Sequence, residues 1–283
     1  MDDLISVIVT TYNREDALGA VLRSLSRQTE RHFEVIVADD GSRPATTSTV
    51  ESFVARMPVA LKHVWHEDRG FRVAEIRNRA IRAASGRYCV FVDGDCIARA
   101  DFVAAHRRLA EAGRFVTGNR VLLSRGLSER ILSSGLEPEC WALGHFLTGR
   151  WRGAVNRVAP LVRLPLGPLR KLGGRRWEGA RSCNIALFRD DLERVDGFDA
   201  AYIGWGREDS DLVVRLIRAG VRRKDGRFAT GVLHLWHPER ERSQLADNEA
   251  RLELALRSER WRALQGLSAL DGAVQCDGDQ AGA

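Results

Sequence analysis

Short apolar runs and segments with helical spacing alternate along the first third of the chain. The apolar runs predict four strands, at 4–10, 33–38, 59–65 and 89–92. Between them, apolar residues recur three and four positions apart, which predicts helices at 14–28, 46–56 and 73–84. Strands that alternate with helices pair in parallel. This order therefore predicts an α/β fold with a mainly parallel sheet and helices on both faces.

The pattern is looser beyond Asp101. It predicts helices at 102–112, 210–220 and 245–264, and strands at 115–123, 182–188 and 228–235. The stretch 126–176 contains prolines and many glycines, so we expect it to be irregular. Residues 266–283 are poor in large apolar side chains and are expected to form a disordered tail. We therefore expect a single domain at 1–265, built from halves at 1–103 and 104–265.

Composition narrows the class of protein. Hydrophobic residues make up 44% of the chain and charged residues 29%, as in an ordinary soluble globular protein. No apolar stretch reaches the roughly 18 residues of a membrane-spanning helix, and the start lacks the basic region of a signal peptide. The five cysteines are odd in number and lack CxxC spacing. They favour reduced thiols in the cytoplasm and argue against a zinc site.

Positive charge is concentrated in one segment. The formal net charge is +6, and the segment 141–177 contains no acidic residue. Apolar residues interleave its basic ones, so the segment is suited to contact with anionic lipid head groups or an anionic acceptor. A solvated loop beside a phosphate site remains an alternative. The basic residues of the segment are Arg150, Arg152, Arg157, Arg163, Arg170, Lys171, Arg175 and Arg176.

Two aspartates follow the buried strand at 89–92. Asp93 and Asp95 flank a glycine at the end of this strand, where open α/β sheets bind ligands. Carboxylates in this arrangement suit a hard divalent cation such as Mg²⁺ or Mn²⁺, although an acidic turn would look the same. The first two strands also end in polar clusters, which contain Tyr12 and Asp40. An aromatic ring can stack on a base and a carboxylate can accept hydrogen bonds from it, so the three clusters together predict a nucleotide site.

As a set, these motifs resemble the family 2 glycosyltransferases of the GT-A fold. The segments that carry the resemblance are TTYNR, VIVADDGS, AEIRNRAI and VFVDGDC, within about residues 4–103. The resemblance implies a nucleotide-sugar donor bound by the half at 1–103, and Mn²⁺ or Mg²⁺ as cofactor. It implies Asp95 as the main metal ligand, with Asp93 contacting ribose or metal. The residues that it implies for the nucleotide-sugar are Thr10, Tyr12, Asp39, Asp40, Arg77, Asn78, Asp93 and Gly94.

A second motif lies at 204–209, with the sequence GWGRED. A glycine-rich turn that starts a helix would also place acids there, because the helix dipole favours them. A tryptophan between glycines, however, suits stacking on a sugar, and a neighbouring carboxylate can accept a proton from a hydroxyl. The block resembles a segment of β-1,4-galactosyltransferases and chondroitin-type polymerases. This resemblance implies Asp209 as catalytic base with Glu208 beside it, Trp205 and Gly206 at the acceptor, and inversion at the sugar.

The family segment also supplies a histidine to the metal. His234 is the favoured candidate and His237 the alternate. Together the motifs predict a metal-dependent inverting glycosyltransferase of hexosyltransferase type, acting in polysaccharide or glycoconjugate synthesis. It would move a sugar from a UDP-sugar to a hydroxyl of a glycan or lipid-linked acceptor, which the half at 104–265 would bind. We expect a cytoplasmic protein, peripheral at the inner face of the cell membrane through the segment 141–177.

Three other readings are weaker. A sugar-phosphate nucleotidyltransferase needs a glycine-rich signature after the first strand, and TTYNRED lacks it. A nucleic-acid-binding protein would place basic residues on a recognisable module, whereas here acids cluster at strand ends, so no nucleic-acid partner is expected. A nucleotide-sugar or glycan-binding relative without catalysis is disfavoured because Asp95 and Asp209 are both intact.

Overall fold

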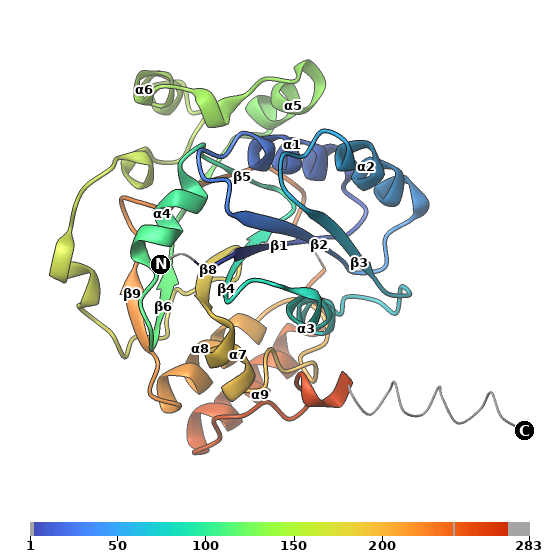
Figure 1. Cartoon of the computed structure of the whole chain (residues 1–283), viewed down its shortest axis with the longest axis vertical. Helices are drawn as coiled ribbons and strands as arrows, with labels where there is room; N and C mark the ends of the chain where they lie inside the picture. Colours follow the sequence, from blue (N-terminus) through green and yellow to red (C-terminus); the bar gives the residue numbers. More distant parts are fainter. Residues whose placement is uncertain (1–2, 240, 271–283) are drawn as a thin grey trace, which may run out of the picture.

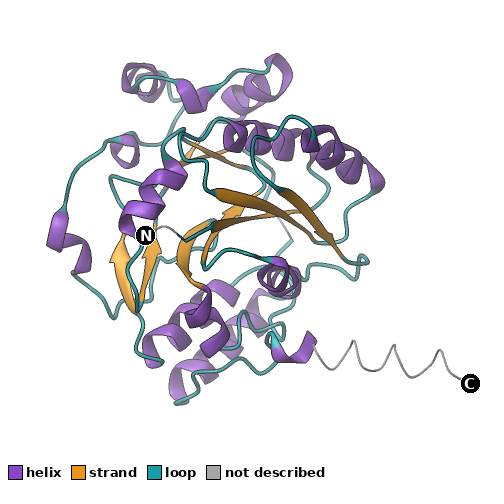
Figure 2. Ribbon diagram, in the orientation of Figure 1, coloured by secondary structure: helices purple, strands orange, loops and turns teal. Residues whose placement is uncertain are grey.

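The fold is built on a seven-stranded sheet (Figures 1 and 2). The computed structural model describes residues 3–239 and 241–270. The strand order is β3-β2-β1-β4-β8-β6-β9. In this order the strands are β3 Leu61–Trp65, β2 Phe33–Asp39, β1 Ile5–Thr11, β4 Tyr88–Asp93, β8 Asn184–Phe188, β6 Arg114–Thr117 and β9 Arg222–Asp225. The predicted α/β architecture is confirmed, with one exception in direction: β8 runs antiparallel to both of its neighbours.

The parallel strands bring the predicted polar clusters to one edge of the sheet. The register pairs Thr10 of β1 with Asp93 of β4, and Thr11 with Asp39 of β2. All three strands therefore end at the same level. This is the edge at which α/β folds bind ligands.

Helices cover both faces of the sheet (Figure 1). Alternate strand side chains face opposite sides, so Val7 and Val9 enter one apolar core while Ile8 enters the other. On the first side lie α1 Glu15–Ser26 and α2 Pro44–Val54, and α4 Phe102–Leu109 packs in the same core. On the other side lie α3 Val73–Ala83, α7 Arg189–Arg194, α8 Glu208–Arg218 and α9 Leu245–Arg257.

A second, three-stranded sheet was not predicted. It contains β5 Cys96–Ala98, β10 Val232–His234 and β7 Arg120–Leu122, with β10 in the middle. The prediction of one strand over 115–123 is wrong, because β6 and β7 belong to different sheets. The chain turns at Gly118, where a Cβ atom would lie only 2.3 Å from the Asn184 side chain. The small sheet pairs His234 with Cys96, next to the predicted metal ligands.

The prediction that 126–176 is irregular is also wrong in part. The structure forms α5 Arg125–Ser134 and α6 Leu143–Trp151 there, with short 3₁₀ turns at Pro138–Cys140, Ala159–Leu161 and Gly167–Lys171. The Ser124 hydroxyl accepts a hydrogen bond from the Leu127 N–H and caps α5, which ends at Gly135 in the left-handed conformation. Among the helices that the structure describes, none is long and apolar enough to cross a bilayer.

The C-terminal part of the domain extends further than predicted. α9 ends at Arg257, earlier than expected, but residues 266–270 still lie against the domain. Leu267 is buried in the core beside α3, and the Ser268 N–H donates to the Asp196 carboxylate at 2.9 Å. The rest of the expected tail, 271–283, lies outside the described residues.

Candidate active site

A cleft of about 800 Å³ opens at the ends of β1 and β4, a volume within the usual range of small-molecule sites. Its walls come from the strand ends, from the loop before β8 and from the turn before α8. Most of the predicted site residues meet there. Those that line the cleft are Thr10, Tyr12, Asp40, Arg77, Asp93, Gly94, Asp95, Trp205, Gly206, Glu208, Asp209, His234 and His237.

Two predicted donor-binding residues lie outside the cleft. Asp39 is buried, and its carboxylate accepts from the Ser42 N–H at 2.9 Å and lies 3.0 Å from His63 Nε2. The amide of Asn78 both donates to and accepts from the backbone of Phe198, at 2.8 Å each. Their polar atoms hold neighbouring loops in place, and neither side chain is among those that line the cleft.

Arg77 joins three of the predicted motifs. Its guanidinium donates to Thr10 Oγ1 at 3.2 Å, to Glu208 at 3.0 Å and to Asp93 at 3.3 Å. The side chain is buried, and its charged end also lies 5.2 Å from the centre of the Phe198 ring. A buried cation of this kind fixes the two carboxylates that it contacts and offsets their charge.

The end of the cleft at Tyr12 and Asp40, where the sequence predicts the nucleoside, is held by hydrogen bonds. Asp40 is buried, accepts from the Arg72 N–H at 3.0 Å and lies 2.8 Å from His66 Nε2. Burial raises the pKa of Asp40, although these two partners oppose the shift. The Tyr12 hydroxyl donates to Asp68 at 2.9 Å, which orients the phenol ring at the cleft wall.

Asp95 faces two histidines. His234 Nε2 lies 3.6 Å from one carboxylate oxygen and His237 Nε2 lies 3.4 Å from the other. His237 Nδ1 lies 2.7 Å from the Pro238 carbonyl, which can only accept, so Nδ1 donates this hydrogen bond and Nε2 is the nitrogen that faces Asp95. Burial lowers the pKa of His234 and favours its neutral ring. One carboxylate and two imidazole nitrogens fit a divalent cation such as Mn²⁺, and both histidines remain candidates.

The turn before α8 separates the two predicted catalytic acids. Gly204, Gly206 and Arg207 have positive φ angles, which let the chain fold sharply into the helix. Glu208 turns inward to Arg77 and is buried. Asp209 lines the cleft, where it accepts from the Ser210 N–H at 2.7 Å and, more weakly, from the Ser182 N–H at 3.4 Å. The open carboxylate is therefore that of Asp209.

The buried Glu208 makes stability depend on pH. Burial first, and then the neighbouring Asp209, raise the pKa of Glu208 to about 7, against the effect of Arg77. The folded state therefore binds the proton more tightly than the unfolded state, and this contribution to stability is lost as pH rises from about 4.5 to 7. We expect Glu208→Gln to flatten the fall in melting temperature between these pH values. An unchanged pH profile in the variant would contradict this assignment.

Comparisons with known proteins identify the family of this chain. Residues 6–157 match the family model described as glycosyl transferase family 2. The chain belongs to this family. Residues 173–238 of this family 2 glycosyltransferase also match a model described as the N-terminal domain of galactosyltransferase, so both predicted resemblances are confirmed. The second match spans the turn at 204–209 and both histidines.

Curated relatives cover most of the chain. Validoxylamine A glucosyltransferase of Streptomyces hygroscopicus subsp. limoneus is 34% identical over 244 residues, which is 81% of this chain and 51% of that protein. Chondroitin synthase of Escherichia coli is 27% identical over 236 residues, 77% of this chain and 33% of that protein. The chain thus spans about half the length, or less, of these two relatives.

Solved structures share the GT-A fold. The TarS 1–349 structure from S. aureus with UDP-GlcNAc has a TM-score of 0.60 at 17% identity, and covers 89% of this chain and 65% of that one. The mannosyltransferase PcManGT from Pyrobaculum calidifontis, with GDP-Man and Mn²⁺, has a TM-score of 0.59 at 21% identity, and covers 90% of this chain and 65% of that one. These similarities establish the fold of this family 2 glycosyltransferase.

Sequence reasoning missed several residues of the cleft. Arg120 and Arg181 enter it from β7 and from the loop before β8, and Trp236 follows β10. The basic segment contributes little, since of residues 141–177 only Trp177 lines the cleft. Two of its cations are used internally: Arg163 forms an ion pair with Asp101, and the buried Arg170 donates to backbone carbonyls. The basic side chains of the segment therefore do not line the cleft.

Proposed function

We propose that this glycosyltransferase moves a sugar from a UDP-sugar to a hydroxyl of a glycan or lipid-linked acceptor, with inversion and with a divalent metal. One observation carries the proposal. The open carboxylate of Asp209 faces the same cleft as Asp95, its two histidines and the Arg77-anchored Asp93. A base and a diphosphate-binding corner thus share one cavity.

The donor would lie along the strand ends. Tyr12 and Asp40 would bind the base, with Thr10 and Gly94 beside the nucleoside and Asp93 at the ribose. Asp95 with His234 or His237 would hold Mn²⁺ or Mg²⁺, which when bound offsets the negative charge of the departing diphosphate. Arginines that line the cleft, such as Arg120 and Arg181, supply further positive charge for the diphosphate.

Asp209 would act as general base. It takes the proton of the acceptor hydroxyl, whose oxygen forms a bond to the anomeric carbon of the sugar. The bond from that carbon to the diphosphate oxygen breaks on the opposite face, and its electron pair leaves with the nucleoside diphosphate. Trp205, held in the turn before α8, would stack on the acceptor sugar. Attack opposite to the leaving group inverts the configuration.

A thermal-shift panel tests the donor site. Binding to the native state raises the melting temperature according to ln(1 + [L]/Kd), so UDP, GDP, CDP and ADP can be ranked with and without Mn²⁺. We expect Mn²⁺-dependent stabilisation that is largest with UDP, followed by product formation from a UDP-sugar. Larger stabilisation by another nucleotide would show that the donor carries that nucleotide instead of UDP. A donor that binds and is never transferred would indicate a binding protein without catalysis.

The two histidines can be separated by mutation. We expect His234→Ala to weaken Mn²⁺ binding by the roughly 10- to 100-fold typical of losing a ligand or its support. His237→Ala is the matched variant, because both rings face the same carboxylate. The measurement is a Mn²⁺ titration by electron paramagnetic resonance with UDP present. A larger loss in His237→Ala would make His237 the ligand.

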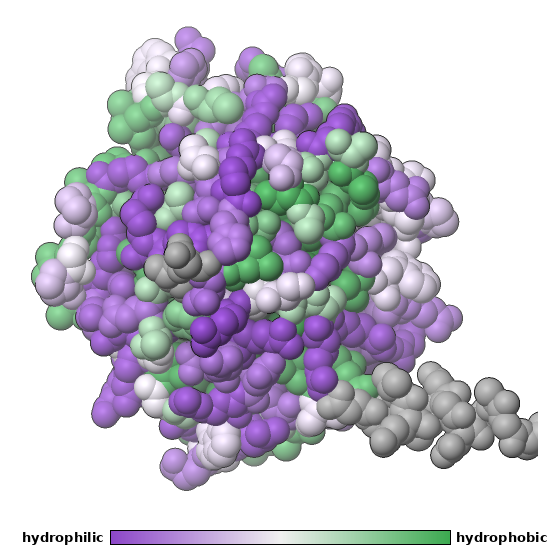
Figure 3. Space-filling view, in the orientation of Figure 1, coloured by the Kyte–Doolittle hydropathy of each residue, from purple (hydrophilic) through white to green (hydrophobic). Residues whose placement is uncertain are grey.

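Membrane contact would use α6. Leu143, Leu147 and Trp151 are exposed at four-residue spacing, and Trp151 is 86% exposed. Four-residue spacing puts them on one face of the helix, next to Arg150 and Arg152. α6 lies at the edge of the molecule in Figure 1, and hydrophobic residues lie beside hydrophilic ones there in Figure 3. This surface fits an anionic membrane. Reduced thiols, as the cysteine pattern favours, would place the contact at the cytoplasmic side.

Vesicle sedimentation tests this contact. We expect the chain to sediment with vesicles that contain phosphatidylglycerol and to stay free with phosphatidylcholine alone. Trp151→Ala should reduce the bound fraction several-fold, because an interfacial tryptophan is a strong anchor. Trp261→Ala is a matched control, since Trp261 is also exposed but lies outside α6. Equal binding by both variants would contradict the role of α6.

A further inference from the structure

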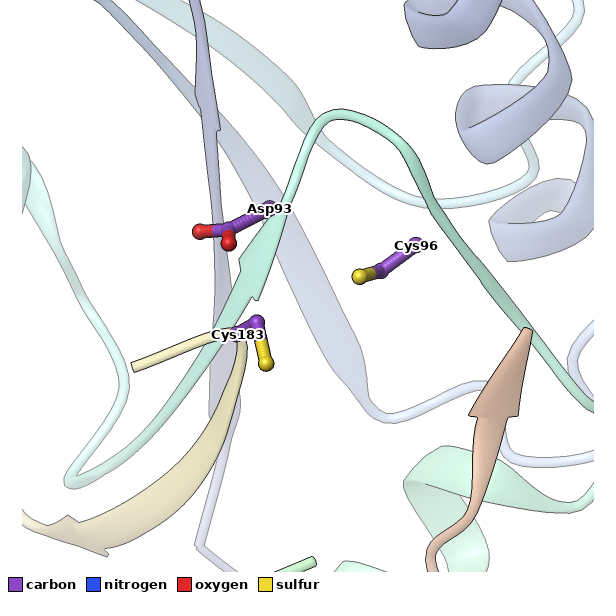
Figure 4. A group of neighbouring side chains, drawn as sticks. All are labelled: Asp93, Cys96 and Cys183. Atoms are coloured by element: carbon purple, nitrogen blue, oxygen red, sulfur yellow. The ribbon is translucent and has the colours of Figure 1, made fainter. Parts of the chain in front are cut away.

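Two cysteines and one aspartate from separate segments lie close together (Figure 4), and two of the three line the cleft. Cys96 begins β5, Cys183 precedes β8, and Asp93 ends β4. Their sulfur atoms and one carboxylate oxygen all lie within 4.8 Å of one another. Both cysteines are free thiols, Cys96 fully buried and Cys183 4% exposed. The proposed reaction uses neither thiol, so the cluster needs its own explanation.

We propose that Asp93, Cys96 and Cys183 form a binding site for a divalent cation that prefers sulfur ligands, such as zinc. Zinc takes sulfur ligands at about 2.3 Å and carboxylate ligands at about 2.0–2.2 Å in a tetrahedron, which places ligand atoms roughly 3.5–3.8 Å apart. Side-chain rotations that bring the three atoms together by about 1 Å reach this geometry. Binding replaces the two S–H protons, which pass to water.

The sequence argued against a zinc site because no CxxC motif is present. The fold overrides that argument, since β4 and β8 are neighbouring strands although they are far apart along the chain. Two thiols with a carboxylate are a softer donor set than the oxygen ligands that Mg²⁺ and Mn²⁺ prefer. The cluster is thus softer than the proposed hard-cation site at Asp95 and the two histidines, and it lies directly beside that site, since Cys96 also has its sulfur within 4.8 Å of ligand atoms of Asp95 and His234.

Access and charge also fit a cation. Asp93 and Cys183 line the cleft, so an ion can enter from solvent and keep its fourth position open to the cleft. Three anionic ligands exceed the charge of one divalent cation, and two guanidinium groups border the site. Arg77 contacts Asp93 at 3.3 Å, and Arg120 Nη1 lies 4.0 Å from Cys183 Sγ. These cations offset the excess negative charge.

Zinc at this site would inhibit sugar transfer. It would engage Asp93, which the donor needs, and would hold Cys96, whose Sγ lies 3.5 Å from Asp95 Oδ1. This consequence rests on the proposed function, whereas binding of zinc does not. The two are therefore measured separately, with binding assayed in the absence of any nucleotide.

Cobalt reports the binding directly. The full chain, reduced with a phosphine, is titrated with Co²⁺ alone, because thiolate ligation gives a charge-transfer absorption in the near ultraviolet. We expect this absorption to saturate at one thiolate-bound Co²⁺ per chain and to be abolished when Zn²⁺ displaces that ion. Cys183→Ser and Cys96→Ser should each lose at least half of the absorption. Cys140→Ser, the exposed-cysteine control, should keep all of it, and so should Asp95→Asn.

Three results would overturn the proposal: no absorption with the wild-type chain, full absorption in Cys183→Ser, or loss in Asp95→Asn equal to that in Cys183→Ser. An alkylation measurement on the wild-type chain tests the proposal even if a cysteine variant fails to fold. Zinc should protect Cys183 from iodoacetamide at least 10-fold while Cys140 reacts as before, as read by mass spectrometry. Equal alkylation of Cys183 with and without zinc would also overturn it.

An activity assay then tests whether zinc inhibits sugar transfer. With saturating Mn²⁺ and a UDP-sugar, equimolar zinc should lower the rate at least 10-fold in the wild type and in Cys140→Ser, and leave Cys183→Ser unaffected. Cobalt binding together with a zinc-insensitive rate would refute the inhibitory role alone. An enzyme that transfers no sugar at all would refute the proposed function and leave the cobalt result standing.

Discussion

Asp209→Asn should lower the rate of sugar transfer by roughly 10²–10⁴-fold, the usual contribution of a general base. Asparagine keeps the shape of the side chain and can still accept from the Ser210 N–H, but it cannot take a proton from the acceptor hydroxyl. The rate is measured with saturating donor and Mn²⁺. Since Asp209 is outside the metal corner, we expect UDP binding in the thermal-shift assay to remain close to the wild-type value.

The matched control is Glu178→Gln. Glu178 also lines the cleft, so this variant removes one negative charge from the same cavity without touching the proposed base. We expect its transfer rate to stay within a few-fold of the wild type. Transfer that persists in Asp209→Asn, or an equal loss in Glu178→Gln, would show that charge in the cleft matters rather than a base at this position. Glu208 would then be the next candidate.

The ends of the parallel strands could be predicted from the sequence. Each strand is a short apolar run that stops at polar residues, and parallel pairing puts Thr10 and Asp93 side by side. The location of the site therefore follows from local pattern and topology. The sequence does not tell which side chain of each motif faces the cleft. A shift of one residue along a strand or helix turns a side chain to a different side.

Asp39 and Asn78 show this limit. Asp39 and Asp40 are neighbours, but Asp39 closes the turn with the Ser42 N–H while Asp40 reaches the cleft. Adjacent helix positions differ by about 100°, so Arg77 points to the site and Asn78 points to the loop at Phe198. The same rotation separates Glu208 from Asp209. Motif matching alone cannot resolve such pairs.

The region between β7 and β8 was harder to predict. α5 and α6 are short and rich in arginine and glycine, so their apolar spacing is weak, although Ile131 and Phe146 anchor them in the core. The break between β6 and β7 depends on the close approach of Gly118 and Asn184. Asp93 and Cys183 likewise come together only because β4 pairs with β8. Long-range contacts of this kind leave no local signal in the sequence.

Arg77→Met should destabilise the fold by about 3–5 kcal/mol, the usual cost of leaving buried charge uncompensated. Methionine matches the apolar part of the side chain, but Glu208 and Asp93 lose the cation that each contacts. Arg79→Met on the same helix is the control, because Arg79 is partly exposed and its pair with Glu75 contributes little. The measurement is the free energy of unfolding from urea titration.

A double variant identifies the cause of this loss. If uncompensated charge is responsible, adding Glu208→Gln to Arg77→Met should restore part of the lost stability above pH 7, where Glu208, whose pKa is raised to about 7, would otherwise carry a charge. Lost packing against Phe198 would instead make the two effects additive. UDP binding should stay weak in the double variant, since Asp93 is still without its partner. Recovery of stability without recovery of binding would therefore show that Arg77 both neutralises buried charge and positions Asp93 for the donor.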